Sequence, residues 1–297
     1  MIIENKIDLY AYFNLPRPYP EAKGYLNAYI ISRSDEYTKN RVRPAMVIFP
    51  GGAYWFRSDR ENEPIALAYL SKGFNAFTVE YSVVCESEKA KHPVMLIEAA
   101  MAVAYVRENA DKYNVISDKI AVIGFSAGGH LAGTITTMFN SQEVLSALKD
   151  KASLCKPDAS VLCYPVITFT NATHGGTRTN LTGIANKAEY SKEELAIFDS
   201  LSVEKRVTDN TPPCFIWATY EDGSVPVINS ILMAQALTLN KVPFDLHVFR
   251  KGVHGLSLCN IETSTNSCTQ AHIEPIAEEW FELSIKFLRQ LDFICKN

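Results

Sequence analysis

The five residues Gly124 to Gly128, which read GFSAG, constrain the fold of this chain more than any other feature. They follow a short apolar run, Lys119 to Ile123, and precede a helical pattern that passes through His130 and Leu131. Small residues on both sides of a central serine suit a sharp turn from a strand into a helix, because larger side chains would clash there. We therefore expect Ser126 to project from a strand–turn–helix unit at the N-terminus of the helix, where developing negative charge is favoured.

Short apolar runs alternate with helical patterns along most of the chain. The expected strands are Ala45 to Phe49, Ala76 to Tyr81, Lys119 to Gly124, Ala159 to Tyr164, Cys214 to Thr219 and Phe244 to Phe249. The expected helices between and after them are Glu63 to Lys72, His92 to Tyr113, Val227 to Leu239 and Pro275 to Ile294. Such alternation predicts an α/β fold with a mostly parallel central sheet and helices on both faces, in which ligands bind at the carboxyl ends of the strands.

One polar stretch, Thr168 to Lys187, interrupts the alternation and shows little apolar periodicity. We expect it to be a long loop or a partial lid. The sequence shows neither an internal repeat nor a linker rich in proline and glycine, and 297 residues is an ordinary length for one α/β domain. A single domain over residues 1–297 is therefore expected.

Composition argues against several classes of partner and location. Hydrophobic residues make up 47% of the chain, the formal net charge is −4, and the basic residues are scattered, so we expect neither nucleic acid nor a membrane as partner. The N-terminal residues lack the pattern of a secretory signal. The seven cysteines are odd in number and widely spaced, which favours buried reduced thiols in a cytoplasmic protein over disulfides or zinc ligation. They are Cys85, Cys155, Cys163, Cys214, Cys259, Cys268 and Cys295.

A serine hydroxyl needs a base to become a nucleophile, and the base needs a group that orients it. His254 is the best placed of the six histidines, because it follows an expected strand in a loop that contains two glycines. His130 lies inside the helix after the serine and is expected to be a packing residue. After the strand that ends at Thr219, the turn offers two adjacent carboxylates, Glu221 and Asp222, and we prefer Asp222 because it is nearer to the turn glycine.

A loop of small residues, Pro50 to Tyr54, follows the first predicted strand of the alternating pattern and reads PGGAY. Its backbone N–H groups, together with that of Ala127, are candidate donors to the oxyanion of a tetrahedral intermediate. The glycine spacing fits neither a phosphate loop nor a dinucleotide-binding loop. We therefore interpret this loop as part of the same site as the serine.

With PGGAY, GFSAGGH and Val253 to Gly255 taken together, the chain resembles the α/β-hydrolase superfamily of esterases and lipases. It is most similar there to the bacterial acetyl esterases, which include acetyl xylan esterases, feruloyl-esterase-like carboxylesterases of the BD-FAE type and relatives of kynurenine formamidase. The order Ser126, Asp222, His254 along the chain is the order of that fold and differs from chymotrypsin and subtilisin.

The resemblance implies roles for individual residues. It implies that Gly52, Ala53 and Ala127 donate to the oxyanion, that Asp222 and not Glu221 is the triad acid, and that no metal or organic cofactor is used. Two positions depart from the pattern of lipase relatives: Pro50 stands where they usually have histidine, and Ala53 stands where the third glycine usually lies. Alanine still offers an N–H group, so the second departure bears on pocket shape.

We expect a serine carboxylesterase that works through an acyl-enzyme and removes short acyl groups, above all acetyl, from a small-molecule or oligosaccharide ester. Aromatic and polar residues near the expected mouth suit such a substrate better than a long acyl chain; these candidate contacts are Tyr54, Trp55, Arg57, His174 and Arg178. An arylformamidase or small peptidase with the same triad is the alternative, and a catalytically silent binding protein is the alternative from another class. The sequence leaves a homo-oligomer open.

Overall fold

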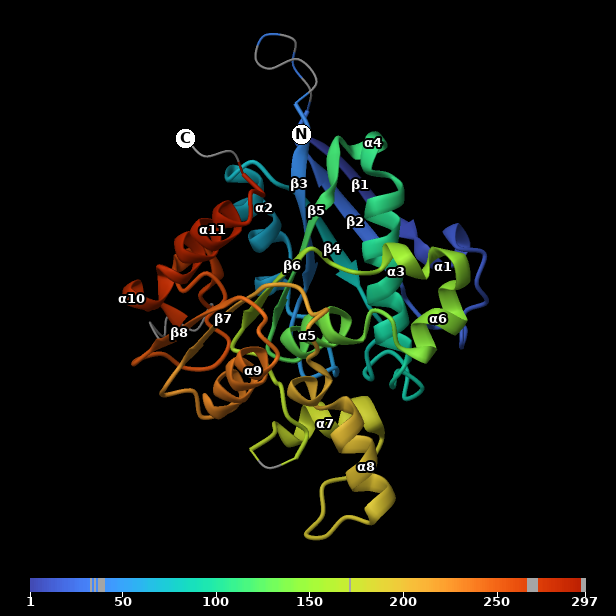
Figure 1. Ribbon diagram of the computed structural model, residues 1–297, viewed down its shortest axis with the longest axis vertical. Coiled ribbons are helices and arrows are strands. Elements are labelled where there is room, and N and C mark those ends of the chain that lie inside the picture. The colour runs from blue at the N-terminus through green and yellow to red at the C-terminus, as the bar shows by residue number, and fades with distance from the viewer. Residues whose placement is uncertain (33, 35, 37–40, 171, 266–271, 295–297) are drawn as a thin grey trace.

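An eight-stranded sheet in the order β1-β2-β4-β3-β5-β6-β7-β8 forms the centre of the computed structural model, which describes residues 1–32, 34, 36, 41–170, 172–265 and 272–294 (Figure 1). The strands from β3 to β8 are parallel where they pair, and β2 runs antiparallel to both β1 and β4. The strands are β1 (Ile2–Asp8), β2 (Tyr25–Ile30), β3 (Arg43–Phe49), β4 (Asn75–Glu80), β5 (Val115–Phe125), β6 (Ala159–Cys163), β7 (Cys214–Thr219) and β8 (Phe244–Phe249).

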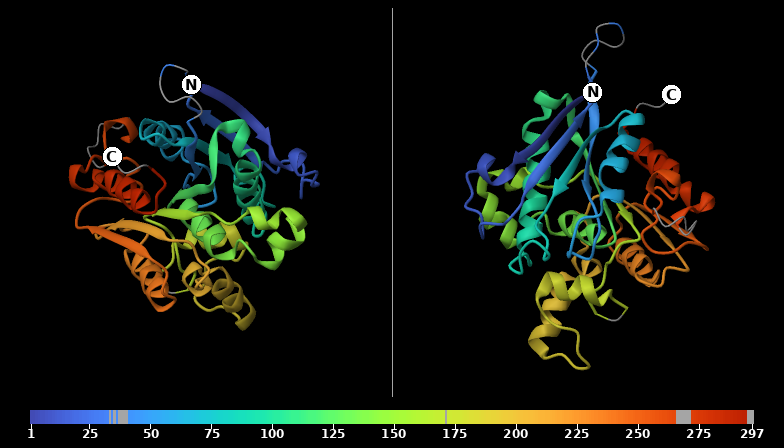
Figure 2. Two further views of the ribbon diagram at one scale, coloured as in Figure 1. Left: turned by 45° about the horizontal axis from the view of Figure 1, so that its top comes forward. Right: turned by 180° about the vertical axis from the view of Figure 1, so that it is seen from behind.

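Helices lie on both faces of this sheet, so the predicted α/β class is confirmed (Figures 1 and 2). The α-helices are α1 (Leu9–Tyr12), α2 (Glu63–Ser71), α3 (Val94–Glu108), α4 (Ala110–Tyr113), α5 (Ala127–Met138), α6 (Gln142–Leu148), α7 (Gly175–Thr182), α8 (Lys192–Leu201), α9 (Ile228–Leu239), α10 (Pro275–Glu278) and α11 (Trp280–Gln290). Short 3₁₀ turns are η1 (Asp59–Glu61), η2 (Lys149–Leu154), η3 (Val203–Arg206) and η4 (Ile261–Thr263).

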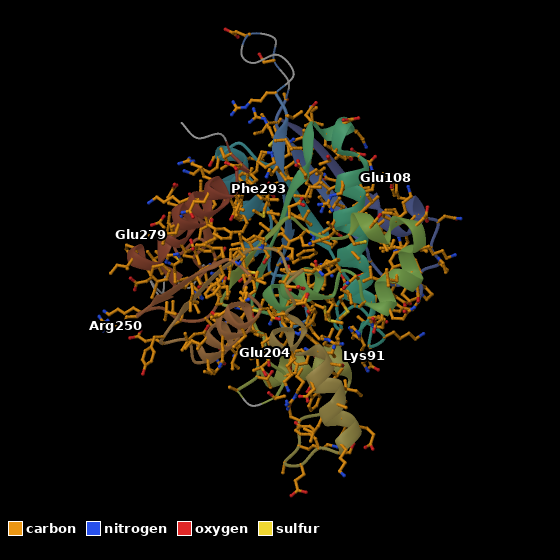
Figure 3. The ribbon with its side chains drawn as sticks, viewed as in Figure 1. Lys91, Glu108, Glu204, Arg250, Glu279 and Phe293 are labelled. Atoms are coloured by element: carbon orange, nitrogen blue, oxygen red, sulfur yellow. The ribbon has the colours of Figure 1, made fainter. Side chains whose placement is uncertain are left out.

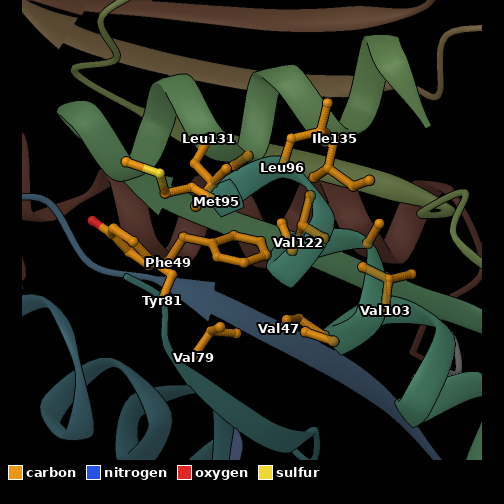
Figure 4. Packing of buried hydrophobic residues seen from close by; sticks show 14 of the residues in the cluster. Val47, Phe49, Val79, Tyr81, Met95, Leu96, Val103, Val122, Leu131 and Ile135 are labelled. Atoms are coloured by element: carbon orange, nitrogen blue, oxygen red, sulfur yellow. The ribbon is translucent and has the colours of Figure 1, made fainter. Parts of the chain in front are cut away.

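Two apolar clusters hold the layers together, one on each face of the sheet. Successive side chains of a strand point to opposite faces, so Val47 and Phe49 of β3 join one cluster while Met46 and Ile48 join the other. The first cluster packs under α3, α5 and α9, and Figure 4 shows Leu131 of α5 close to the strands. The second packs under α2 and α11. Strands buried on both faces explain the nearly continuous apolar runs seen in the sequence.

The stretch after β6 does not remain a loop as the sequence suggested. Within it, residues 175–182 form α7, and residue 171 lies outside the described residues. His174 caps this helix, since its Nδ1 accepts a hydrogen bond from the Thr177 N–H at 3.1 Å. Together with α8, the helix protrudes beyond the carboxyl ends of the parallel strands (Figures 1 and 2). Part of the expected loop or partial lid is therefore helical.

Exposed charged side chains lie at several separate places on the outline of the molecule (Figure 3). Glu108, Arg250 and Glu279, which are exposed, lie at separate points of the outline in Figure 3. None of the described helices has the length and apolar character of a membrane span.

Candidate active site

Ser126 occupies a strained turn between β5 and α5. Its backbone has φ +54° and ψ −116°, a conformation that L-residues seldom adopt, and only 8% of the residue is exposed. The flanking glycines make this turn possible. A Cβ at Gly124 would lie 2.0 Å from the Gly128 carbonyl oxygen, and one at Gly128 would lie 2.1 Å from the Phe49 carbonyl oxygen. The glycines of GFSAG are thus sterically required where β3, β5 and α5 meet.

The structure brings Ser126, His254 and Asp222 into one continuous set of hydrogen bonds. His254 Nδ1 lies 2.6 Å from Asp222 Oδ2, and His254 Nε2 lies 2.8 Å from Ser126 Oγ. A carboxylate can only accept, so Nδ1 carries the proton and the free lone pair of Nε2 faces the serine hydroxyl. These three side chains come from the loops that follow β5, β7 and β8, whose carboxyl ends meet at one edge of the sheet.

Backbone donors hold the carboxylate of Asp222 in this orientation. Its Oδ1 accepts hydrogen bonds from the N–H groups of Ser224 and Val225, both at 2.9 Å, and only 1% of the side chain is exposed. The neighbouring Glu221 is exposed. The preference for Asp222 over Glu221 therefore agrees with the geometry.

The loop after β3 lies directly beside the nucleophile. A Cβ at Gly51 would be 3.1 Å from the Ser126 Cβ, and Gly52, Ala53 and Tyr54 all have positive φ. Among the described residues, no hydrogen bond uses the N–H groups of Gly52 and Ala53 as donors. The N–H of Ala127 is at the first position of α5, where no intrahelical acceptor exists. The three expected oxyanion donors are thus unengaged beside the serine.

Three of the five expected substrate contacts, Tyr54, Arg57 and Arg178, have most of their polar atoms bonded inside the protein. The Tyr54 side chain is buried, and its hydroxyl donates to Nδ1 of His130 at 2.9 Å. Arg57 forms a forked ion pair with Glu86. The sequence does not reveal where such long side chains end, and these internal contacts do not favour the expected role of the three residues in substrate binding.

Arg178 is the third of these side chains. It is buried, it donates to the carbonyl oxygen of Phe169, and its guanidinium lies over the rings of Tyr190 and Phe198. The buried His130 is the packing residue that the sequence suggested, because its Nε2–H donates to the Leu201 carbonyl oxygen at 2.8 Å and burial lowers its pKa to about 4.

Trp55 and His174 remain available to a ligand. Trp55 is 52% exposed and directly follows the loop with the candidate oxyanion donors. Nδ1 of His174 acts as acceptor at the cap of α7, so its Nε2 carries the proton as a donor. Burial and the neighbouring His254 lower the pKa of His174, while Asp222 raises it, so this ring lies near the triad.

Among the described residues, no cysteine thiol hydrogen-bonds to Ser126, His254 or Asp222. Cys155, Cys163, Cys214 and Cys259 are buried free thiols, and burial raises the pKa of Cys155 and Cys214 to about 12. Cys85 is free and exposed, and Cys268 and Cys295 lie outside the described residues. Across the described ranges, no three His, Cys, Asp or Glu side chains come together in a way that could hold a metal ion.

Comparison with known proteins gives one consistent family. The sequence profile of the BD-FAE family matches residues 34–237. The chain is 40% identical to endo-1,4-beta-xylanase B of Butyrivibrio fibrisolvens over 74% of its own length, and 30% identical to acetylxylan esterase of Xylanibacter ruminicola over 71%. It spans only 33% and 40% of the length of these two relatives.

A solved structure agrees with this result. The acetyl ester-xyloside bifunctional hydrolase of Caldicellulosiruptor lactoaceticus superposes with a TM-score of 0.73 at 34% identity, and the alignment covers 91% of this chain and 89% of the other. The resemblance noted in the sequence is thereby confirmed. The chain belongs to the BD-FAE family and has the α/β-hydrolase fold.

Proposed function

We propose that this chain is a serine carboxylesterase that removes short acyl groups, chiefly acetyl, from acylated oligosaccharides. The observation that carries the proposal is the continuous Ser126–His254–Asp222 hydrogen-bonded set at the edge of the sheet where the parallel strands end. A free N–H group at Gly52, Ala53 and Ala127 beside the serine adds the donors that an acyl transfer needs. We include a cytoplasmic location in the proposal, because the buried cysteines are free thiols.

In this mechanism Ser126 Oγ attacks the ester carbonyl carbon while His254 Nε2 takes its proton. The carbonyl oxygen becomes an oxyanion. The N–H groups of Gly52 and Ala53, in the loop of residues 50–54 (the oxyanion loop), and the N–H of Ala127 stabilise it. His254 then gives the proton to the leaving alcohol, and the acyl group stays on the serine. A water molecule, deprotonated by the same histidine, hydrolyses this acyl-enzyme. Asp222 keeps the imidazole in the required tautomer and stabilises its charged form.

The substrate class depends on weaker support than the reaction. Two relatives carry names that refer to acetylated xylan or xyloside, and the exposed ring of Trp55 beside the oxyanion loop offers an apolar face to a sugar. His174, which caps α7 near the triad, offers its Nε2–H as a donor to a sugar hydroxyl. We therefore place the oligosaccharide between these two side chains.

The test compares hydrolysis of 4-nitrophenyl acetate, butyrate and octanoate, and acetate release from acetylated xylo-oligosaccharides, by wild type and by Ser126→Ala. The control is Ser146→Ala, which replaces an exposed serine of α6. We expect activity to fall with chain length and to drop by roughly 10⁴-fold or more in Ser126→Ala. Faster turnover of octanoate than acetate would contradict the short-acyl proposal.

The same assay separates the alternatives. Release of formate from N-formylkynurenine, with inert acetyl esters, would identify an arylformamidase that uses the same triad. Failure of a fluorophosphonate probe to label Ser126 would instead support the silent binding protein. Labelling in wild type and in Ser146→Ala, but not in Ser126→Ala, is the result expected for an active serine hydrolase.

A further inference from the structure

A buried carboxylate, Glu61, connects the oxyanion loop to the loop that carries His254. The residue is only 3% exposed and lies at the end of the short turn η1. Its Oε2 accepts a hydrogen bond from the Gly51 N–H at 2.7 Å, and its Oε1 accepts one from the Tyr164 hydroxyl, also at 2.7 Å. Gly51 directly precedes the two N–H groups that we assign to the oxyanion, so Glu61 holds the base of that loop.

Tyr164 continues the connection to the loop of the catalytic histidine. Its hydroxyl oxygen accepts a hydrogen bond from the Ser257 N–H at 2.9 Å. The tyrosine ring also packs edge-on against the ring of His254, with ring centroids 5.2 Å apart and an interplanar angle of 72°. A displacement of Tyr164 would therefore shift the His254 imidazole in two ways, through the contact between the rings and through the backbone of the loop that carries His254.

Arg60, the neighbour of Glu61, supports the same loop from its other side. Its guanidinium donates to the Gly255 carbonyl oxygen at 2.7 Å, and its own carbonyl oxygen accepts from the Ser257 hydroxyl at 2.6 Å. The turn η1 thus holds Gly51 on one side and both Gly255 and Ser257 on the other. These contacts fix the separation between the oxyanion loop and the loop after β8 that carries His254 (the histidine loop).

The ionised form of Glu61 accepts both hydrogen bonds at once. A protonated carboxyl group would keep its contact with Tyr164 only if the tyrosine hydroxyl turned to accept, because one carboxyl oxygen would then donate. Burial raises the pKa of Glu61 above its usual value, and the hydrogen bonds from Tyr164 and Gly51 offset only part of this rise. A buried charge is costly for folding, and this one makes its hydrogen bonds to the two loops that carry the proposed reaction.

We propose that Glu61 is a positioning residue that sets the oxyanion loop relative to His254, through Gly51 on one side and Tyr164 on the other. This inference rests on the proposed function, since it assigns a role within the same site. The loop contacts the oxyanion only in the transition state, so its displacement lowers kcat and leaves KM nearly unchanged. A shift of about 1 Å in such groups can cost on the order of 100-fold in rate.

Two substitutions test the two arms of the connection. Glu61→Gln keeps the shape of the side chain, but its amide offers only one acceptor oxygen, so either the Gly51 N–H or the Tyr164 O–H loses its acceptor. Tyr164→Phe removes only the hydroxyl that joins Glu61 to Ser257 and leaves the Gly51 contact intact. We expect kcat for 4-nitrophenyl acetate to fall about 10- to 100-fold in Glu61→Gln and about 3- to 10-fold in Tyr164→Phe, with KM within about threefold of wild type.

Glu98→Gln is a matched control, because Glu98 is also a fully buried carboxylate that accepts from a backbone N–H and a tyrosine hydroxyl. Its donors are the Ser82 N–H at 2.7 Å and the Tyr10 hydroxyl at 3.1 Å, and it contacts neither loop of the site. We expect this variant to change thermal stability while its kcat stays within about twofold of wild type. An equal loss of kcat in Glu61→Gln and Glu98→Gln would overturn the inference, since any buried carboxylate would then have the same effect.

The rate of fluorophosphonate labelling of Ser126 gives a readout that does not depend on the natural substrate. Slower labelling in Glu61→Gln and Tyr164→Phe than in Glu98→Gln supports the positioning role, even if wild type hydrolyses no ester and the proposed substrate is wrong. Wild-type kcat and labelling rate in Glu61→Gln overturn it. If Glu61→Gln does not fold, as judged by circular dichroism, Tyr164→Phe decides: an unchanged kcat and labelling rate overturn the inference. A wild type that never labels overturns both proposals.

Discussion

Asn180 of α7 donates a hydrogen bond from Nδ2 to the carbonyl oxygen of Ala53 at 2.8 Å. This bond ties the protruding helix to the loop that carries the proposed oxyanion donors. Ala53 has a φ of +56°, which is unfavourable for a residue with a side chain, so the loop needs external support to keep this conformation. The helix therefore contributes to the site through the backbone of Ala53.

Replacing Asn180 by alanine should lower kcat about 3- to 10-fold with little change in KM, because the oxyanion donors lose part of their support. Asn240→Ala is the matched control, since Asn240 also donates one side-chain hydrogen bond to a backbone carbonyl, that of Ala236, at the end of α9. Steady-state hydrolysis of 4-nitrophenyl acetate measures both variants. Equal kcat in wild type and Asn180→Ala would show that the loop holds its conformation unaided.

Asp222→Asn should lower kcat by about 10⁴-fold, because the amide oxygen stays with the N–H groups of Ser224 and Val225 and its NH₂ group then faces His254 Nδ1, which imposes the wrong tautomer. The neighbouring exposed carboxylate provides the control, and Glu221→Gln should retain wild-type turnover. The comparison uses kcat/KM for 4-nitrophenyl acetate at pH 7.5. A large loss in Glu221→Gln with an active Asp222→Asn would assign the acid to the other residue.

The parts of the fold that the sequence predicted well share a simple physical origin. β7 and β8 were predicted with the bounds that the structure shows, because each is a short strand between turns. The strand β1 was missed, since it pairs only with β2 at the edge of the sheet and mixes charged with apolar residues. The helix α8 was also missed, although Ser191 and Glu194 form the capping box that marks its start.

In the candidate site, the residues that follow strand ends could be predicted from the sequence, whereas the partners of long side chains could not. Ser126, Asp222 and His254 each follow a strand of a parallel sheet, so their meeting could be anticipated from order alone. Arg57 and Arg178 instead find partners in elements far along the chain or across a turn, which the sequence does not specify. The support from Glu61 and Asn180 was missed for the same reason, because each acts on the backbone of a loop that it reaches only in the folded protein.

Gly128→Ala should destabilise the fold strongly, because the new Cβ would lie 2.1 Å from the Phe49 carbonyl oxygen and 2.4 Å from that of Pro50. Backbone atoms cannot move aside as a flexible side chain can, so we expect a loss of about 3 kcal/mol or more in the free energy of unfolding. Gly223→Ala is the control, because its Cβ would meet nothing within 4 Å. Urea unfolding followed by circular dichroism measures both, and an unchanged midpoint in Gly128→Ala would refute the steric account of this turn.

Glu98 should make the stability of the protein depend on pH. Burial raises the pKa of Glu98 to about 7, from 4.5 for the exposed group. The folded state therefore holds this proton more tightly than the unfolded state does. The resulting stabilisation is complete below about pH 4.5 and is lost as the pH rises through about 7.

The unfolding free energy of wild type minus that of Glu98→Gln should therefore fall by about 3 kcal/mol as the pH rises from 4.5 to 8. Subtracting the variant removes the contributions of all other titrating groups, which the two proteins share. Urea unfolding at several pH values in this range provides the measurement. Parallel stability curves would mean that Glu98 titrates alike in the folded and unfolded states.

Trp55 should contribute to recognition of a sugar more than to the chemistry of ester cleavage. Two hydrogen bonds fix the backbone of Trp55 beside the oxyanion loop: its N–H donates to the Gly52 carbonyl oxygen at 2.8 Å, and its carbonyl oxygen accepts from the Cys85 N–H at 3.0 Å. The residue is nevertheless 52% exposed. An aromatic face of this kind contributes about 0.5–1.5 kcal/mol to a stacking contact. Trp55→Ala should therefore lower kcat/KM for acetylated xylo-oligosaccharides about 3- to 10-fold relative to kcat/KM for 4-nitrophenyl acetate. Trp55→Phe, which keeps an aromatic face, should retain most of the preference, and an unchanged ratio in Trp55→Ala would place the sugar elsewhere.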